Sequence, residues 1–206
     1  MEKIVLYYYI VLNNLTLACG ENIKLLLVDA GLEHEYVRLE GGESWKEKKK
    51  MLEKEKGQGV QLKRLFKTVP VMRYISAKLN YRYHGSTPEE NHFINMIPEL
   101  VESWLMSLKN ATLNSKIRMP IKNESRQDHV DIESSKQLAM FNKYYLDYPG
   151  PFLVGEKIIY ADFLINHMLD DDDCLDELKH YPQLATFVEA FKQRPNLNSY
   201  LASLRH

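Results

Sequence analysis

A proline at position 70 stands where the sequence is otherwise typical of a β-strand, in the segment Thr68-Val69-Pro70. Proline has no backbone N–H, so at this place it needs an edge strand or a special backbone geometry. An ordinary trans proline entering an edge strand is one interpretation. A cis peptide bond is the other, and it would turn the backbone of Val69 outward, where an extended peptide could pair with it.

Ser86 and the pair formed by Trp45 and Lys49 are candidates for binding a charged group. Ser86 stands before a predicted helix, where a hydroxyl and free backbone N–H groups can bind an anion, although a plain helix cap uses the same geometry. Trp45 and Lys49 are one helical turn apart, so one ligand could touch both. A partly buried tryptophan beside solvated lysines explains that spacing equally well. Lys67, next to Thr68, is a further candidate cation.

Tyr8 lies between two other tyrosines in the apolar run from residue 3 to residue 12. That run is rich in β-branched and aromatic residues, which predicts a buried strand. Side chains alternate along a strand, so Tyr8 should face the side opposite to Tyr7 and Tyr9.

Composition argues against several kinds of function. Only two cysteines occur, Cys19 and Cys174, without a CxxC pair or a His/Cys cluster at metal-ligand spacing, so neither a disulfide framework nor a metal site is expected. The 27 basic and 28 acidic residues leave a net charge of −1, which would not attract nucleic acid. The apolar N-terminal run is too short to cross a membrane. We therefore expect a soluble protein of the reducing cytoplasm.

The elements that must position these groups begin with a β-α-β unit. Apolar residues at helical spacing in 21–30 predict a helix that Gly31 ends, and residues 34–39 alternate as a second strand, parallel to the first. A charged helix is expected within 45–65, broken near the glycines of "GQG". The runs 69–75 and 79–84 predict a β-hairpin, which completes the order β-α-β-α-β-β.

From Pro88 onward, strand signals give way to long stretches with a period of 3.6 residues. A Ser-Thr cap, a proline and two acidic residues mark the start of the first of these helices. Further helices are expected in 131–147, 160–180 and 182–204. An α/β domain over residues 1–86 is therefore expected to precede an all-helical domain over residues 88–206.

Two motifs are specific in combination, namely FKTVPV after a β-α-β-α unit and FLVGEKIIYADFLINHML in the helical half. They resemble motifs of the cytosolic glutathione transferases, the first the cis-proline region of the family's thioredoxin-like domain and the second its [FY]-L-x-G-[DN]-x-[LI]-[ST]-x-A-D stretch. AGLEHEYVRLEGGESW and the C-terminal YPQLATFVEAFKQRPNLNSYLAS are similar to further segments of the alpha, mu, pi and sigma classes. The resemblance covers nearly the whole chain and implies a thioredoxin-like α/β domain with a mixed sheet, followed by an all-α domain.

The resemblance also implies a glutathione site. The segment Thr68–Pro70 matches the one whose main chain pairs with the cysteinyl part of glutathione, through Val69. In the family, a serine at the start of the third helix, usually in a [QE]-S pair, binds the γ-glutamyl carboxylate, and Ser86 matches it. Trp45 and Lys49 match a pair that contacts the glycine carboxylate.

Thiol activation is the chemical step that such an enzyme must supply, because a free thiol with a pKa near 8.5 is only slightly ionised at neutral pH. The alpha, mu, pi and sigma classes use a tyrosine at the end of the first strand, which donates a hydrogen bond to the sulfur, and Tyr8 matches it. Thr16 is the second candidate, because it aligns with the catalytic Ser or Cys of other classes. The arginine that often follows the tyrosine has no match, and Cys19 falls near its place.

Some positions depart from the family pattern. Gly85 replaces the Gln or Glu before Ser86, and Asn95 stands where related classes have an aspartate that reaches the partner subunit's glutathione. Ile159 replaces the Ser or Thr that pairs with Asp162, so only the acidic half of that capping box should remain. The short interval between Ser86 and Asn95 predicts that the third helix is truncated or merged with the next helix, and that the glutathione site is weakened.

The function implied is the conjugation of reduced glutathione to a hydrophobic electrophile in detoxification, or a glutathione-dependent isomerase or peroxidase reaction. The resemblance implies a cytoplasmic homodimer with glutathione as substrate and without metal, nucleic acid or membrane. The departures leave open a non-catalytic binding or regulatory protein of the same fold. An assembly module of a multienzyme complex is a third hypothesis.

Overall fold

The computed structural model describes most of the chain, namely residues 4–10, 19–40, 42–54, 65, 67–113 and 129–204. Its contacts group into two compact units, Met1–Ile75 and Ser76–His206. The division falls inside a helix, earlier in the chain than the expected boundary near residue 86. Thr16 and the expected break at "GQG" lie outside the described residues.

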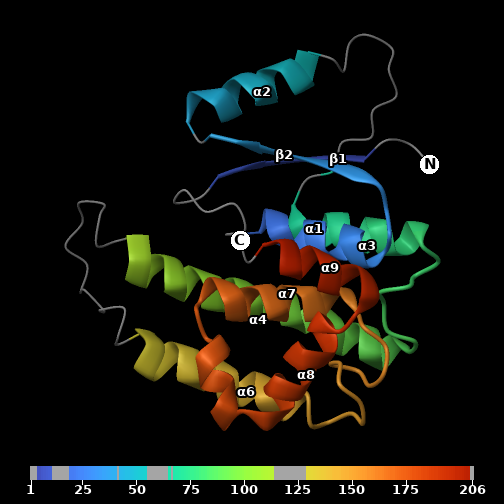
Figure 1. Ribbon diagram of the computed structural model, residues 1–206, viewed down its shortest axis with the longest axis vertical. Helices are drawn as coiled ribbons and strands as arrows, with labels where there is room; N and C mark the ends of the chain where they lie inside the picture. Colours follow the sequence, from blue (N-terminus) through green and yellow to red (C-terminus); the bar gives the residue numbers. More distant parts are fainter. Residues whose placement is uncertain are drawn as a thin grey trace. The chain divides into compact units, whose positions relative to one another are not determined.

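The N-terminal unit contains the predicted β-α-β unit (Figure 1). Its elements in chain order are β1 (Ile4–Tyr9), α1 (Gly20–Asp29), β2 (His34–Leu39), α2 (Glu43–Lys54) and most of α3 (Thr68–Lys78). The two strands pair in parallel, as the crossover helix requires, and α1 and α2 lie on opposite faces of the pair. The apolar side of α1 is buried, with Leu26 and Leu27 fully inaccessible, and the helix is followed by Gly31 with a φ of 68°.

The predicted hairpin at 69–84 is wrong, because α3 occupies most of that segment. Buried Met72, Ile75 and Ser76 recur at helical spacing along it. A turn that contains Asn80 and Tyr81 in the left-handed conformation replaces the second strand. The third helix is therefore complete and lies earlier in the chain than predicted, so the expected truncation after Ser86 is also wrong.

Pro70 lies in the first turn of α3, and no peptide bond among the described residues is cis. Backbone N–H groups in the first turn of a helix have no acceptor within the helix, so proline, which lacks this group, is compatible with the position. The N–H of Val71 already bonds the carbonyl of Lys67 at 3.1 Å. Pro70 therefore marks the start of a helix rather than of a strand, and Val69 belongs to the same helical turn.

His34, at the start of β2, makes two polar contacts within the N-terminal unit. Its Nδ1 lies 2.6 Å from the carbonyl of Leu32, and its Nε2 lies 2.7 Å from the ammonium nitrogen of Lys24. The neutral ring donates to the carbonyl and accepts from the ammonium group, whereas a protonated ring could only repel the ammonium group. Burial, with help from Lys24, lowers the pKa of His34.

We expect the free energy of unfolding to fall as pH drops through the window between this lowered pKa and about 6.5, the unfolded value, since the unfolded chain binds the extra proton there. Urea titrations of the wild type and His34→Gln from about pH 8 to about pH 5 would measure this, and the variant should show the smaller loss. Equal losses in the two proteins would contradict the role given to His34.

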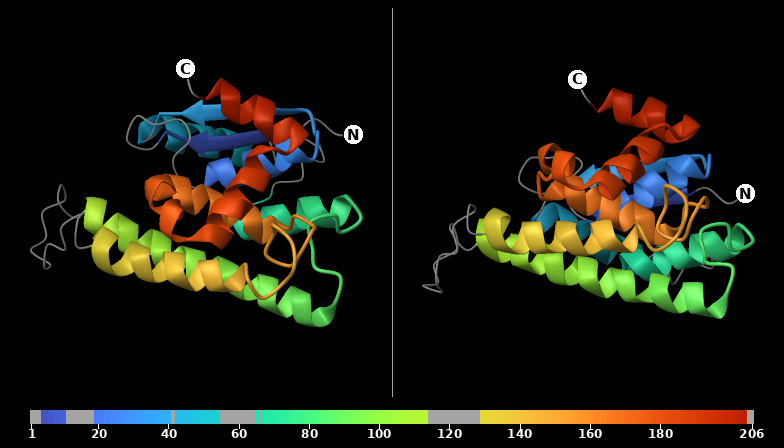
Figure 2. Two further views of the ribbon diagram at one scale, coloured as in Figure 1. Left: turned by 60° about the horizontal axis from the view of Figure 1, so that its bottom comes forward. Right: turned by 90° about the horizontal axis from the view of Figure 1, so that it is seen from below.

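The C-terminal unit is helical throughout its described elements. After the end of α3 these are α4 (Pro88–Leu113), a π-helical turn (His129–Ser134), α6 (Ser135–Tyr144), α7 (Tyr160–Asp171), a 3₁₀ turn (Leu175–His180), α8 (Pro182–Lys192) and α9 (Pro195–Ser203). α4 and α6 run side by side in both views of Figure 2. The all-helical C-terminal part of the predicted fold is confirmed. Among the described residues the N-terminal sheet is a parallel pair of strands, without the antiparallel strands of the expected mixed sheet.

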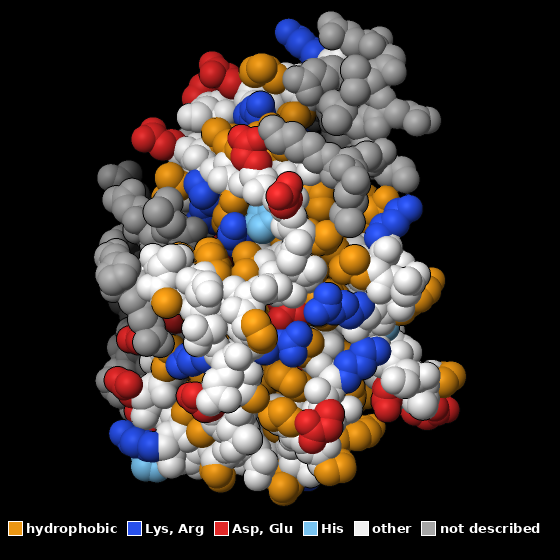
Figure 3. Space-filling view, turned by 45° about the vertical axis from the view of Figure 1, so that its right-hand side comes forward, with side chains coloured by type: hydrophobic (Ala, Val, Ile, Leu, Met, Phe, Trp, Pro, Cys, Tyr) orange, Lys and Arg blue, Asp and Glu red, His pale blue; other side chains and the backbone are white. Residues whose placement is uncertain are grey.

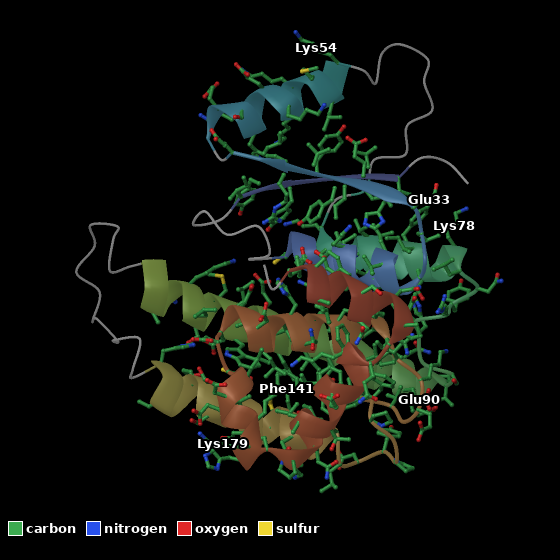
Figure 4. The ribbon with its side chains drawn as sticks, in the orientation of Figure 1. Glu33, Lys54, Lys78, Glu90, Phe141 and Lys179 are labelled. Atoms are coloured by element: carbon green, nitrogen blue, oxygen red, sulfur yellow. The ribbon has the colours of Figure 1, made fainter. Side chains whose placement is uncertain are left out.

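Aromatic side chains fill the core of the helical unit. Phe141 points into its interior (Figure 4) and stacks on Trp104 of α4, with ring centroids 5.9 Å apart. Tyr145 stacks on Phe187 of α8 at 4.4 Å. These four rings are fully buried, and rings of this size contribute a large share of the stabilisation of a core.

A buried carboxylate, Asp172, connects three elements of this unit. It accepts hydrogen bonds from the indole N–H of Trp104 at 2.7 Å and from the hydroxyl of Ser134 at 2.6 Å. The Nε2 atom of His129 lies 3.1 Å from its other oxygen, and the Nδ1 atom of that ring lies 3.1 Å from the hydroxyl of Ser107. A buried charge is tolerated when it is bonded in this way.

Asp162 is a second buried carboxylate, in the first turn of α7. It accepts from the N–H of Ile159 at 2.8 Å, from the N–H of Leu153 at 3.1 Å and from the hydroxyl of Tyr145 at 2.9 Å. The acidic half of the capping box is therefore present, as predicted, and Ile159 provides no side-chain bond to the helix.

The surface carries charges of both signs. On the face shown in Figure 3, acidic and basic side chains are interspersed among apolar ones. Within the part of the chain that the structure describes, no helix is both long enough and apolar enough to cross a membrane.

Candidate functional site

Tyr8, near the end of β1, faces α1. Its ring lies against Gly20, the first residue of that helix, while the ammonium group of Lys48 from α2 lies 4.7 Å from the ring centroid of Tyr7. The two tyrosines therefore occupy opposite faces of the strand, as alternation predicts. Alternation fails for Tyr9 at the strand end, because its ring stacks on Tyr8 with centroids 4.8 Å apart.

Gly20 allows two phenols to approach the start of α1. A Cβ atom on this residue would lie 2.5 Å from the ring of Tyr8 and 2.6 Å from the hydroxyl oxygen of Tyr36. Neither distance is possible for a real side chain, so any other residue would displace both phenols. Gly20 was not predicted to belong to the site, although a glycine at a helix start can signal the close approach of another group.

Burial raises the pKa of Tyr8, with nearby Cys19 as the next largest cause. Burial also raises the pKa of Tyr36, assisted by Glu21, while Arg38 opposes that rise and donates a hydrogen bond to the Tyr36 hydroxyl. Both phenols consequently keep their protons at neutral pH. A protonated phenol is a hydrogen-bond donor, which is the form needed to stabilise a neighbouring anion.

Thr68, the first residue of α3, lies close to the start of α1. Its hydroxyl oxygen is 3.5 Å from the carbonyl oxygen of Cys19, the residue before Gly20. Lys67, directly before it, is exposed and has a φ of 71°, in the left-handed region that lysine seldom adopts. The structure thus brings Tyr8, Cys19 and Thr68 together, with a lysine beside them.

Trp45 and Lys49 lie on α2, one turn apart as predicted. Trp45 is half-buried, with its ring centroid 5.9 Å from that of Tyr9, and Lys49 is exposed. This pair therefore stands next to the strand end that carries Tyr8 and Tyr9.

Ser86 belongs to the C-terminal unit, where it precedes α4 rather than the third helix. Thr87 is the residue that caps α4, since its hydroxyl accepts from the N–H of Glu90 at 3.1 Å. The carboxylate of Glu90 in turn accepts from the N–H of Ser86 at 2.6 Å. This reciprocal arrangement is the helix cap that the sequence allowed as the alternative for this segment.

Asn95 lies on α4, and its side-chain oxygen accepts a hydrogen bond of 2.7 Å from the hydroxyl of Tyr160. Within the described residues, no group of three or more His, Cys, Asp or Glu side chains could hold a metal ion.

The chain is similar in sequence to known proteins. Residues 110–204 match the family model described as "Glutathione S-transferase, C-terminal domain". The chain is 30% identical over 188 residues to "Glutathione S-transferase P 10" of Caenorhabditis elegans. The matched region covers 88% of this chain and 85% of that relative.

Solved structures agree at the level of the fold. The glutathione S-transferase from Ascaris lumbricoides superposes with a TM-score of 0.74 at 20% identity, covering 98% of this chain and 97% of the other. The Onchocerca volvulus pi-class glutathione S-transferase superposes with a TM-score of 0.71 at 22% identity, covering 97% and 92%.

Proposed function

The chain belongs to the cytosolic glutathione transferases, and from this premise we propose that it conjugates reduced glutathione to a hydrophobic electrophile with Tyr8 as the activating group. The thiol of glutathione loses its proton to solvent, and the sulfur then forms a bond to an electrophilic carbon. With chlorodinitrobenzene as the electrophile, chloride leaves and a thioether remains. Isomerase and peroxidase reactions would use the same activated thiol.

The environment of Tyr8 is the observation that carries this proposal. Its phenol is half-buried against the start of α1, and its raised pKa keeps the hydroxyl protonated. A protonated phenol can donate to a thiolate without adding a competing negative charge, and such a bond favours the ionised thiol.

We assign the γ-glutamyl carboxylate to Thr68 rather than to Ser86. Thr68 begins the third helix, the place of the family's [QE]-S pair, and Lys67 then stands where that pair has Gln or Glu. A hydroxyl, the free N–H groups of a first helical turn and an adjacent ammonium group suit a carboxylate.

Replacing Thr68 by valine should weaken glutathione binding about tenfold, because a hydrogen bond to a charged group is lost. Ser86→Ala is the matched control and should leave the dissociation constant unchanged. Isothermal titration calorimetry with reduced glutathione measures both. The opposite ranking of the two variants would return the carboxylate site to Ser86.

Trp45 and Lys49 are proposed to hold the glycine carboxylate of glutathione. Their position beside Tyr9, at the end of β1, supports this assignment. An exposed lysine keeps its charge available to a ligand, while a half-buried tryptophan offers an indole N–H as a second donor.

We also propose that this chain forms a homodimer, acts in detoxification and is located in the cytoplasm, as in the family. Neither Cys19 nor Cys174 is part of a disulfide, which fits a reducing compartment. Analytical ultracentrifugation tests the dimer, and in that dimer Asn95 would face the partner's glutathione in place of an aspartate.

A non-catalytic binding protein of this fold is the competing hypothesis, and its main support, the missing third helix, has disappeared because α3 is complete. Calorimetry with glutathione and a conjugation assay with chlorodinitrobenzene decide between the two. Binding with turnover supports the enzyme, binding without turnover on a panel of electrophiles supports the non-catalytic protein, and no binding at millimolar glutathione contradicts the enzyme.

A further inference from the structure

Arg38 of β2 lies next to Tyr8 in the sheet. The two residues are partners in the parallel register, so their side chains emerge on the same face. The central carbon of the guanidinium group lies 5.5 Å from the ring centroid of Tyr8 and 5.1 Å from that of Tyr36. The same group donates a hydrogen bond to the hydroxyl of Tyr36. One guanidinium group therefore contacts both of the phenols that lie against Gly20.

The segment that connects β1 to α1 contributes no positive charge of its own, because no lysine or arginine occurs between Tyr9 and Ile23. A positive charge near a bound thiol favours the thiolate, and a cation over an aromatic face restrains the ring. We infer that Arg38 is a positioning residue for thiol activation, which holds the Tyr8 ring in place and supplies from β2 the cation that the connecting segment lacks. This inference rests on the function proposed for Tyr8.

An arginine suits this place better than a lysine would. Its planar fork can lie over two rings and still donate to the Tyr36 hydroxyl, whereas an ammonium group is a point charge that would remain more strongly hydrated. Tyr36 therefore helps to hold the guanidinium group in place. Among the residues that the structure describes, the other charged or titratable groups near the two phenols include Cys19, Glu21 and Lys24 from the α1 side and Tyr9 on β1.

The first test compares Arg38→Met and Arg38→Lys by the pH dependence of kcat/KM with chlorodinitrobenzene. Arg38→Met should lower kcat/KM about tenfold and move the acidic limb of the profile to higher pH, because the bound thiol ionises less readily. Arg38→Lys should restore the position of the limb but only part of the rate. An unchanged limb in Arg38→Met, or a loss confined to a higher KM for glutathione, would overturn the inference.

The second test reads the Tyr8 ring directly and does not depend on turnover. Protein labelled with ring-¹³C tyrosine gives a Tyr8 resonance that Tyr8→Phe assigns. Arg38→Met should shift that resonance, whereas Arg82→Met, which removes a similar cation 5.3 Å from the ring of Tyr83 in the other unit, should not. A Tyr8 resonance that stays in place would overturn the positioning role, even if the wild type proves unable to bind glutathione and the proposed function fails.

Tyr36→Phe keeps the test decisive if Arg38→Met does not fold. This variant removes only the hydroxyl that holds the guanidinium group, so it should shift the Tyr8 resonance and lower kcat/KM about threefold. Wild-type values for both measurements in a folded Tyr36→Phe protein would count against Arg38 as the positioning residue.

Discussion

Replacing Tyr8 by phenylalanine should lower kcat/KM for the conjugation of glutathione about 100-fold, the size of loss that follows removal of one preorganised donor to a developing negative charge. The ring would keep its contacts with Gly20 and Tyr9, so the protein should fold normally. The bound thiol should ionise at higher pH. Steady-state kinetics and the pH profile of the wild type and the variant measure both effects.

Tyr7→Phe is the matched control, because Tyr7 lies on the other face of β1 against Lys48. It should retain the wild-type rate. Should Tyr8→Phe retain it too, the donor must be a different hydroxyl, and Thr16 is then the next residue to replace. A circular dichroism spectrum of each variant separates lost chemistry from lost structure.

Replacing Asp162 by alanine should lower the free energy of unfolding by about 4 kcal/mol, because three buried donors lose their acceptor at once. These donors are the N–H groups of Leu153 and Ile159 and the hydroxyl of Tyr145. Chemical denaturation followed by circular dichroism gives the value. Asp170→Asn, at an exposed position on the same helix, should change the free energy by less than about 0.5 kcal/mol.

The same residue predicts a pH dependence. Burial raises the pKa of Asp162 to about 7, although its three hydrogen bonds and Arg194 oppose the rise. Because this value lies above the unfolded value near 4, the contribution of Asp162 to stability should decline as pH rises from about 4 to about 7. That part of the pH dependence should be missing in Asp162→Ala. A variant as stable as the wild type at every pH would contradict both expectations.

Periodicity was sufficient to predict the β-α-β unit and the helical half, because long apolar patterns have few alternative structures. It failed at α3, where Val69 and Val71 alternate with other residues and Pro70 suggested a strand edge. The buried set of Met72, Ile75 and Ser76 favours a helix. Ser76, however, is polar, and its hydroxyl is bonded to Tyr83 and His84 beyond the end of α3. That one error also led to the expectation of a carboxylate site at Ser86, whereas the helix start at which we now propose that site is Thr68.

The groups around Tyr8 were only partly predictable. Alternation in β2 places Tyr36 and Arg38 on one face, yet the sequence does not give the register that sets Arg38 beside Tyr8. The buried network of Asp172 was missed for a similar reason, since Trp104 and His129 are 68 and 43 residues away in sequence. Of the contacts of Asp162, only the capping bond from the N–H of Ile159, three residues away, was predicted.

The chain's two tryptophans give each compact unit its own fluorescent reporter. Trp45 is half-buried on α2 in the N-terminal unit, and Trp104 is fully buried beside Asp172 in the helical unit. In a Trp45→Phe protein, all indole emission comes from Trp104. Comparing its denaturation curve with that of the wild type would therefore reveal whether the two units melt in one cooperative step or in two.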